Sequence, residues 1–224
     1  MKHASSKFAF VVLFSAISAI ALQINFSKVL GAENQYFTLF QFLGPIAGGF
    51  LGPILGAVVA LFSQVIGFLV AGKEPTLLNM FRLAPMLFAA YYFGTKNRKF
   101  DFIIPLLALT LWFAHPIGRE AWLTSAFFLI PLAISLRFKD RLFAKSIGAT
   151  FTAYTIGTVF WLYTIPSTAA FWWALIPVTI TERLLFAAGI SVSYVGFMSV
   201  LAQFSLPSFV KVDYRYTLTN LLKA

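Results

Sequence analysis

The sequence predicts an all-α protein, a polytopic transmembrane helical bundle of about eight spans (six to eight), which form a single integral membrane domain over residues 1–224. Hydrophobic residues make up 60% of the 224 residues, against roughly 45–50% in a typical soluble domain. The 17 basic and 7 acidic residues fall almost entirely in short gaps between long apolar stretches. A soluble chain of this length could not bury so much apolar surface, so this composition predicts a protein embedded in a bilayer.

Composition also excludes several classes of protein. The chain contains no cysteine, which rules out disulfides, thiolate metal sites and thiol catalysis but leaves the redox compartment open. The net charge of +10 could indicate a nucleic-acid partner. The basic residues are scattered between apolar stretches, however, and form no patch interleaved with aromatic residues, so no nucleic acid is expected.

The first predicted span covers residues 8–24 and follows Lys2 and Lys7. A basic start followed by a short apolar stretch is also typical of a signal peptide, with Ala19-Ile20-Ala21 as the cleavage site. Because many apolar stretches follow, a retained first helix is the simpler interpretation.

Residues 36–72 are too many for one span and just enough for two short ones. Gly52-Pro53 is the expected turn between them. Three further glycines, Gly44, Gly48 and Gly56, allow helices to approach closely. The same glycines could instead interrupt a helix that lines a substrate cavity, and the sequence leaves both interpretations open.

The last apolar stretch, 168–202, is longer than one crossing, and Pro177 is expected to divide it. Residues 168–176 would then lie at the interface or in a bent first segment, and residues 178–202 would cross. The other predicted spans are 78–93, 100–114, 121–136 and 143–165.

The basic residues indicate an orientation, because cytoplasmic loops carry an excess of lysine and arginine. With the N-terminus inside, twelve bases lie in inner gaps and termini and three lie in outer gaps. Both termini are therefore predicted to be cytoplasmic, next to anionic lipid. The inner bases are Lys2, Lys7, Lys96, Arg98, Lys99, Arg137, Lys139, Arg141, Lys145, Lys211, Arg215 and Lys223, and the outer ones are Lys28, Lys73 and Arg119.

In this orientation all five tryptophans map to the outer side. Tryptophan commonly anchors a helix at the membrane interface, but an interfacial belt normally occurs on both faces. The one-sided distribution allows some of these rings, Trp112, Trp122 and Trp172 among them, to line an outward pocket instead. The remaining two are Trp161 and Trp173.

Three charged residues, Arg82, Glu182 and Arg183, lie inside apolar segments, where charge is costly and usually functional. Asn79 precedes Arg82 by three residues, so both can share one helix face. Arg82 could bind carboxylate or phosphate through its planar guanidinium, or extend to the interface. Adjacent helical residues diverge by about 100°, so Glu182 is expected to pair with Arg82 and to leave Arg183 free for a ligand. A purely structural ion pair between helices is the alternative.

A compact outer loop over residues 115–120 contains His115, Arg119 and Glu120. His115 could bind a ligand, sense pH or form a hydrogen bond at the interface. All these polar residues map to the outer half, and we expect Arg82, Glu182 and Arg183 to lie in or beside one outward cavity. The candidate substrate-binding residues are Asn79, Arg82, His115, Arg119, Glu120, Glu182, Arg183, Trp112, Trp122 and Trp172.

Neutral polar residues also occur inside the apolar segments. Gln41 and Gln64 are expected to form hydrogen bonds between helices. Several threonines and Tyr154 along residues 150–158 could supply neutral groups to a cavity, although threonine also bonds its own helix backbone.

The sequence contains no metal-ligand cluster, no GxSxG, no Walker A motif and no paired acidic motif for phosphoryl transfer. We therefore predict no catalytic residue, no metal and no cofactor, and an enzyme is the less favoured class. Without an ATP site the chain could not energise transport itself, so a partner would have to supply the energy.

The segment 44–56, Gly-Pro-Ile-Ala-Gly-Gly-Phe-Leu-Gly-Pro-Ile-Leu-Gly, resembles the short glycine-rich second and third helices of one transporter family. These are the membrane-embedded substrate-binding subunits (S-components) of energy-coupling factor transporters. The similarity extends mainly over residues 8–95 and includes small residues in the first helix, Ser15 and Ala19, and polar groups on the outer side. It implies a membrane coupling protein and ATPase subunits as partners, in the cytoplasmic membrane of a prokaryote.

The sequence therefore predicts a membrane transporter subunit that binds a small anionic or zwitterionic solute from the outer side, energised by a partner ATPase. Two alternatives stay open. One is a structural or accessory subunit of a larger membrane complex. The other is a membrane enzyme acting on a lipid head group, with Glu182 or His115 as the acid or base.

Overall fold

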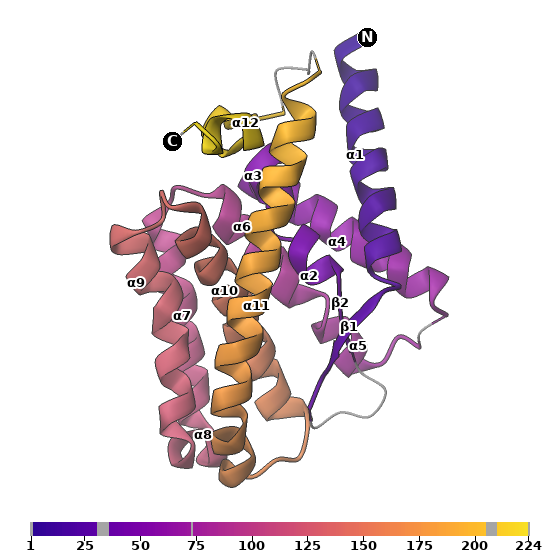
Figure 1. Ribbon diagram of the computed structural model, residues 1–224. Coiled ribbons are helices and arrows are strands. Elements are labelled where there is room, and N and C mark those ends of the chain that lie inside the picture. The colour runs from indigo at the N-terminus through magenta and orange to yellow at the C-terminus, as the bar shows by residue number, and fades with distance from the viewer. Residues whose placement is uncertain (1, 31–35, 73, 205–209, 224) are drawn as a thin grey trace.

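The computed structural model describes residues 2–30, 36–72, 74–204 and 210–223, so Lys73 lies outside it. Most of the described residues are helical, as predicted (Figure 1). The described ends of the chain lie at one end of the molecule and α8 lies at the other. In chain order the elements are α1 (Lys2–Ala21), β1 (Asn25–Lys28), β2 (Tyr36–Thr38), α2 (Phe40–Leu43), α3 (Ile46–Leu51), α4 (Pro53–Val70), α5 (Leu77–Phe81), α6 (Ala84–Gly94), α7 (Arg98–Ala114), α8 (Pro116–Glu120), η1 (Trp122–Leu129), α9 (Ile130–Arg137), α10 (Leu142–Thr164), α11 (Ala169–Leu201), η2 (Tyr214–Tyr216) and α12 (Leu218–Leu221).

Strands β1 and β2 form a short antiparallel hairpin in which Lys28 pairs with Tyr36. The all-α prediction is wrong at this point. The Phe26 ring packs edge-on against Phe42 of α2 at 5.0 Å and lies 5.7 Å from Phe186 of α11. These ring contacts hold the hairpin against the helices, and they join residues too far apart in the sequence for a local pattern to reveal.

The predicted turn at Gly52-Pro53 is confirmed. Gly52 has a φ of 82°, a conformation that favours glycine, and Pro53 follows at the start of α4. The segment before the turn is not one short span, however, but β2 followed by the short helices α2 and α3.

Two predicted spans, 100–114 and 143–165, agree closely with α7 and α10. Two others are interrupted. The 78–93 segment breaks between α5 and α6, just before Pro85, and the 121–136 segment changes from the 3-10 helix η1 to α9 just before Pro131. Both prolines stand in the first turn of the helix that follows the break, where proline is tolerated because its missing N–H would have no partner within the helix.

Pro177 does not divide the last apolar segment, so that prediction is wrong. Helix α11 runs without a break for 33 residues with Pro177 inside it. The helix packs against other elements on both sides of the proline: Trp172 contacts Trp112 before it, and Phe186 contacts the hairpin residue Phe37 after it. A proline inside a helix is tolerated when neighbouring elements support the segment.

The helices α3, α4 and α6 approach one another at the level of their backbones. A Cβ atom placed on Gly48 would lie 1.9 Å from the carbonyl oxygen of Ala90, and one on Gly56 would lie 2.4 Å from the Cα of Gly48. The same is true of Gly94, whose added Cβ would lie 2.5 Å from the oxygen of Gly48. The predicted close packing through glycine is therefore present in the structure.

Two hydrophobic clusters form the core. The larger gathers residues from α1, α2, α3, α4, α6, α10 and α11, and the smaller lies toward α8 around the buried Trp112 and Trp172. Helix α10 contributes to both, through Ala149 and Ala153 in the first and Val159 and Leu162 in the second. It therefore links the two halves of the interior.

Two of the described helices, Pro53–Val70 and Ala169–Leu201, are long and apolar enough to cross a membrane, so the predicted bundle of about eight spans is not confirmed. Only 39% and 33% of their most apolar windows are buried, whereas the core helix of a soluble protein would be mostly buried. Shorter apolar helices lie at Phe10–Ala21, Phe40–Leu51 and Trp122–Arg137.

Replacing Gly48 by alanine should lower the thermal unfolding midpoint of the detergent-purified protein. The added methyl group meets backbone atoms of α6 that cannot rotate away, and overpacking of this kind costs about 1–3 kcal/mol. The matched control is Gly196→Ala, because a Cβ there meets nothing within 4 Å and alanine favours the helix. Equal midpoints for the two variants would contradict the assigned packing.

Candidate functional site

A cavity of about 480 Å³ lies between the hairpin, the break that separates α5 from α6, and the helices α4, α10 and α11. Its volume is in the range of small-molecule sites, about 300–1,000 Å³. All three charged residues of the apolar segments, Arg82, Glu182 and Arg183, line it. The expectation that these residues lie at one cavity is met.

Arg183 is the most deeply buried of the three, with 4% of its surface exposed. Its guanidinium carbon lies 4.6 Å from the ring centre of Phe186, 4.9 Å from that of Phe37 and 5.7 Å from that of Tyr154. Aromatic faces attract a cation and partly replace its lost hydration. Within the described part of the chain, its Nε atom is buried without a hydrogen-bond partner.

Glu182 pairs with Arg183, its neighbour in the sequence. The Arg183 Nη2 atom lies 3.5 Å from Glu182 Oε2, and the Ser27 hydroxyl donates to Glu182 Oε1 at 3.1 Å. The prediction that adjacent helical residues would be unable to pair, and that Glu182 would turn to Arg82, is wrong. Their Cβ directions diverge, but both side chains are long enough to bend toward each other.

Arg82 follows α5 directly and is only partly engaged. Its guanidinium donates to the carbonyl oxygen of Tyr36 at 3.5 Å, at the long limit for a hydrogen bond. Asn79 also lines the cavity, but its side-chain amide donates to the Glu74 carbonyl at 3.0 Å. With respect to the part of the chain that the structure describes, Arg82 therefore retains donors that a ligand could use.

Several aromatic residues contribute to the rest of the wall. Phe81 and Phe160 stack face to face at 4.6 Å, and Tyr154 and Trp161 line the same cavity. Gln64 of α4 lines it too. Its side chain donates at 3.0 Å to the carbonyl of Leu83, the residue before α6, in agreement with the expected hydrogen bond between helices. A flat apolar group can therefore be accommodated next to the charged residues.

The structure separates the predicted site residues into two groups. Asn79, Arg82, Glu182, Arg183 and Trp172 line the cavity. The other five lie elsewhere, toward the α8 end: Trp112 is fully buried in the smaller core, His115 packs edge-on against Tyr163 at 5.1 Å, and Arg119, Glu120 and Trp122 are exposed.

Sequence reasoning missed the contribution of the hairpin. Ser27, Tyr36 and Phe37 each contact one of the three charged residues. No motif marks these residues, since Ser27 lies in the gap after the first apolar stretch and Tyr36 and Phe37 are the first two residues of the next. Aromatic residues flanking such a gap are the signal that could have drawn attention to it.

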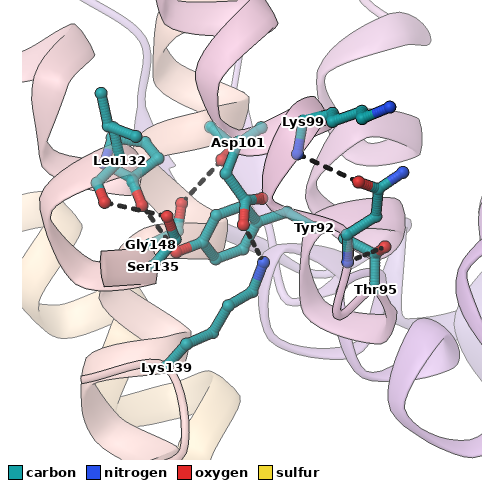
Figure 2. A network of polar contacts seen from close by, with 11 residues as sticks. Tyr92, Thr95, Lys99, Asp101, Leu132, Ser135, Lys139 and Gly148 are labelled. Atoms are coloured by element: carbon teal, nitrogen blue, oxygen red, sulfur yellow. Dashed lines mark hydrogen bonds and ion pairs between the residues drawn. The ribbon is translucent and has the colours of Figure 1, made fainter. Parts of the chain in front are cut away.

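Figure 2 shows a second buried polar network, which the sequence did not suggest and whose residues do not line the cavity. Asp101 of α7 is buried and pairs with Lys139, whose Nζ lies 4.0 Å above the ring of Tyr92. The Tyr92 hydroxyl donates to the Pro131 carbonyl at 2.9 Å. Burial lowers the pKa of Lys139, in the turn after α9, and the hydrogen bond with Asp101 opposes this shift. The network joins α6, α7 and α9.

The described residues contain no group of three or more His, Cys, Asp or Glu side chains that could hold a metal ion. Within the described cavity wall, Glu182 is the one carboxylate. The chemistry that this wall offers is therefore recognition, through two guanidinium groups, one carboxylate, amides, hydroxyls and aromatic rings.

Replacing Lys139 by methionine should destabilise the protein by about 3 kcal/mol, the lower end of the cost for breaking a buried pair, because Lys139 keeps some contact with water. Thermal or denaturant unfolding in detergent would measure this loss. Adding Asp101→Asn should restore part of the lost stability, because an uncharged amide then replaces the buried carboxylate that lost its partner.

The matched control is Arg215→Met, which removes one partner of the exposed pair with Asp213. That variant should unfold close to the parent protein, because exposed pairs contribute little. A loss as large as that of Lys139→Met would show that charge removal in general, and not this buried pair, is responsible.

No protein-family model matches the chain, and no curated protein or solved structure matches it either. The resemblance to the substrate-binding subunits of energy-coupling factor transporters therefore stays a prediction. The function of the cavity has to be argued from its own residues.

Proposed function

We propose that the chain is an integral membrane subunit of a transporter, and that it binds a small anionic or zwitterionic solute in the cavity between Arg82 and Arg183. One observation carries the proposal. The three charged residues that interrupt the apolar segments all line one cavity. Charge buried in a membrane segment is costly, and convergence on a cavity is the arrangement expected when that charge serves binding.

The membrane assignment is supported by the outer faces of the helices. Large apolar side chains are exposed along α4, α7 and α11, for example Ile54, Leu106 and Val192. A monomeric soluble protein rarely exposes such continuous apolar surface. About eight apolar segments, some of them broken helices, would then cross or enter the bilayer.

The charge distribution supports the proposed orientation, with both termini in the cytoplasm. The described ends of the chain lie at the end of the molecule opposite α8 (Figure 1). The smaller core, with Trp112, Trp161 and Trp172, lies toward α8. Basic residues at one end and tryptophans at the other are consistent with an inner and an outer interface.

An energy source would come from partners, a membrane coupling protein and an ATPase, as the resemblance implies. A membrane enzyme is less well supported, since Glu182 already interacts with Arg183 and Ser27 and is poorly placed to act as a general base. His115, the other candidate base, lies away from the cavity.

The orientation can be tested directly because the chain contains no cysteine. A single cysteine at Glu120 should react with a membrane-impermeant maleimide applied to intact cells. A single cysteine at Lys96 should react only after the membrane is permeabilised. The cysteine-free parent serves as the control. The opposite labelling pattern, or labelling of both positions from outside, would rule out this topology.

Solute binding can be tested by thermal-shift screening of the purified protein against small carboxylates, phosphates and amino acids. For any compound that stabilises the protein, Arg183→Ala should weaken binding at least about tenfold, because a hydrogen bond to a charged group contributes about 1.5–3 kcal/mol. Arg82→Ala should weaken it similarly.

The matched control is Arg119→Ala, which removes an exposed arginine outside the cavity and should leave the affinity unchanged. Arg183→Lys keeps the charge and separates a loss of fold from a loss of recognition. If no compound in the panel stabilises the parent protein, or if Arg183→Ala and Arg82→Ala bind as the parent does, the proposed function is wrong.

A further inference from the structure

Resting on the proposed function, we infer that the ligand is a planar monoanion with two distinct ends. One end carries a carboxylate that binds Arg82. The other end carries a cyclic amide, whose adjacent C=O and N–H groups bind Arg183 and Glu182. The argument has three steps, which concern the charge, the hydrogen-bonding pattern and the shape of the cavity.

The charge of the cavity wall favours a single negative charge. The charged residues among its described lining residues are Arg82, Arg183 and Glu182, which leaves one net positive charge. Glu182 lies 3.5 Å from Arg183 and balances it, so the excess charge belongs to Arg82. Among the described residues, Arg82 donates to the Tyr36 carbonyl, and this hydrogen bond is long at 3.5 Å. A carboxylate at Arg82 would neutralise the wall and form a paired hydrogen bond.

The Glu182–Arg183 pair offers a donor beside an acceptor. Arg183 lines the cavity and lies beside Glu182, so its guanidinium presents N–H groups to which a ligand oxygen can bind. The Glu182 carboxylate accepts from Ser27 and retains capacity for another donor. A second carboxylate would be repelled by Glu182, and an ammonium group would be repelled by Arg183. A neutral group that accepts and donates side by side, as a cyclic amide does, matches both.

The shape of the wall favours a flat ligand. Phe81, Phe160 and Trp161 line the cavity together with Phe37, which also contacts Arg183. Aromatic side chains pack well on planar rings in stacked or edge-on arrangements. A volume of about 480 Å³ limits the ligand to a small ring system with its substituents.

Three probes of similar size separate these features. Orotate is planar and has both a carboxylate and a cyclic amide, uracil has the cyclic amide alone, and benzoate has the carboxylate alone. Thermal shift and isothermal titration of the purified protein should show orotate binding at least about tenfold more tightly than either of the others, as expected for one charge-assisted hydrogen bond.

Two variants test which end binds which group. Arg82→Gln should reduce orotate affinity to the level of uracil and leave uracil binding unchanged. Glu182→Gln should reduce the preference for orotate over benzoate, because Arg183 then attracts a carboxylate without opposition. Glu120→Gln, an exposed glutamate outside the cavity, is the matched control and should change neither affinity.

The outcomes distinguish this inference from the proposed function. If benzoate or uracil binds as tightly as orotate, the two-ended ligand is refuted while solute binding stands. The same holds if none of the three probes binds but another anion in the screening panel does. If nothing in the panel binds, both proposals fail together.

Discussion

The arrangement around the cavity depends on the contacts that stabilise the buried guanidinium of Arg183. A cation with 4% of its surface exposed needs a counter-charge and polarisable neighbours. Glu182 supplies the charge, and Phe37 and Phe186 supply aromatic faces. Because Phe37 belongs to the hairpin and Ser27 of the hairpin bonds Glu182, the same interaction holds the hairpin against α11. Without it, one wall of the cavity would lose its main polar contacts.

The remaining walls depend on close helix packing rather than on charge. Backbone contact at Gly48, Gly56 and Gly94 brings α3, α4 and α6 together, and Gly148 of α10 leaves space for the Tyr92 ring. In lipid there is no hydrophobic driving force for helices to associate. Small residues then stabilise the contact because they let the backbones approach and form dispersion contacts over a large area. The Asp101–Lys139 pair adds a polar contact between α7 and the turn that follows α9. These contacts fix the scaffold, and the charged residues of the cavity are placed on it.

Sequence patterns predicted two of the long helices and one turn well. Helices α7 and α10 agree with their apolar stretches, and the Gly52 turn follows from glycine and proline chemistry alone. The convergence of Arg82, Glu182 and Arg183 also followed from the argument that buried charges avoid lipid. What failed depended on tertiary contacts. The hairpin is held by rings of α2 and α11, and Pro177 lies within a continuous helix that packs against other elements on both sides of it. The Glu182–Arg183 pair forms because both side chains are long and flexible enough to meet although their Cβ atoms point in different directions.

The uninterrupted course of α11 has a structural consequence. At 1.5 Å per residue its 33 residues form a rod about 50 Å long, well beyond the roughly 30 Å of a hydrocarbon core. Near its start Trp172 packs on Trp112, and near its end Ser199 accepts a hydrogen bond from the Leu218 amide at 2.7 Å. Arg183 and Glu182 lie between these two attachments. Helix α11 therefore connects the cavity to the C-terminal segment within one continuous element.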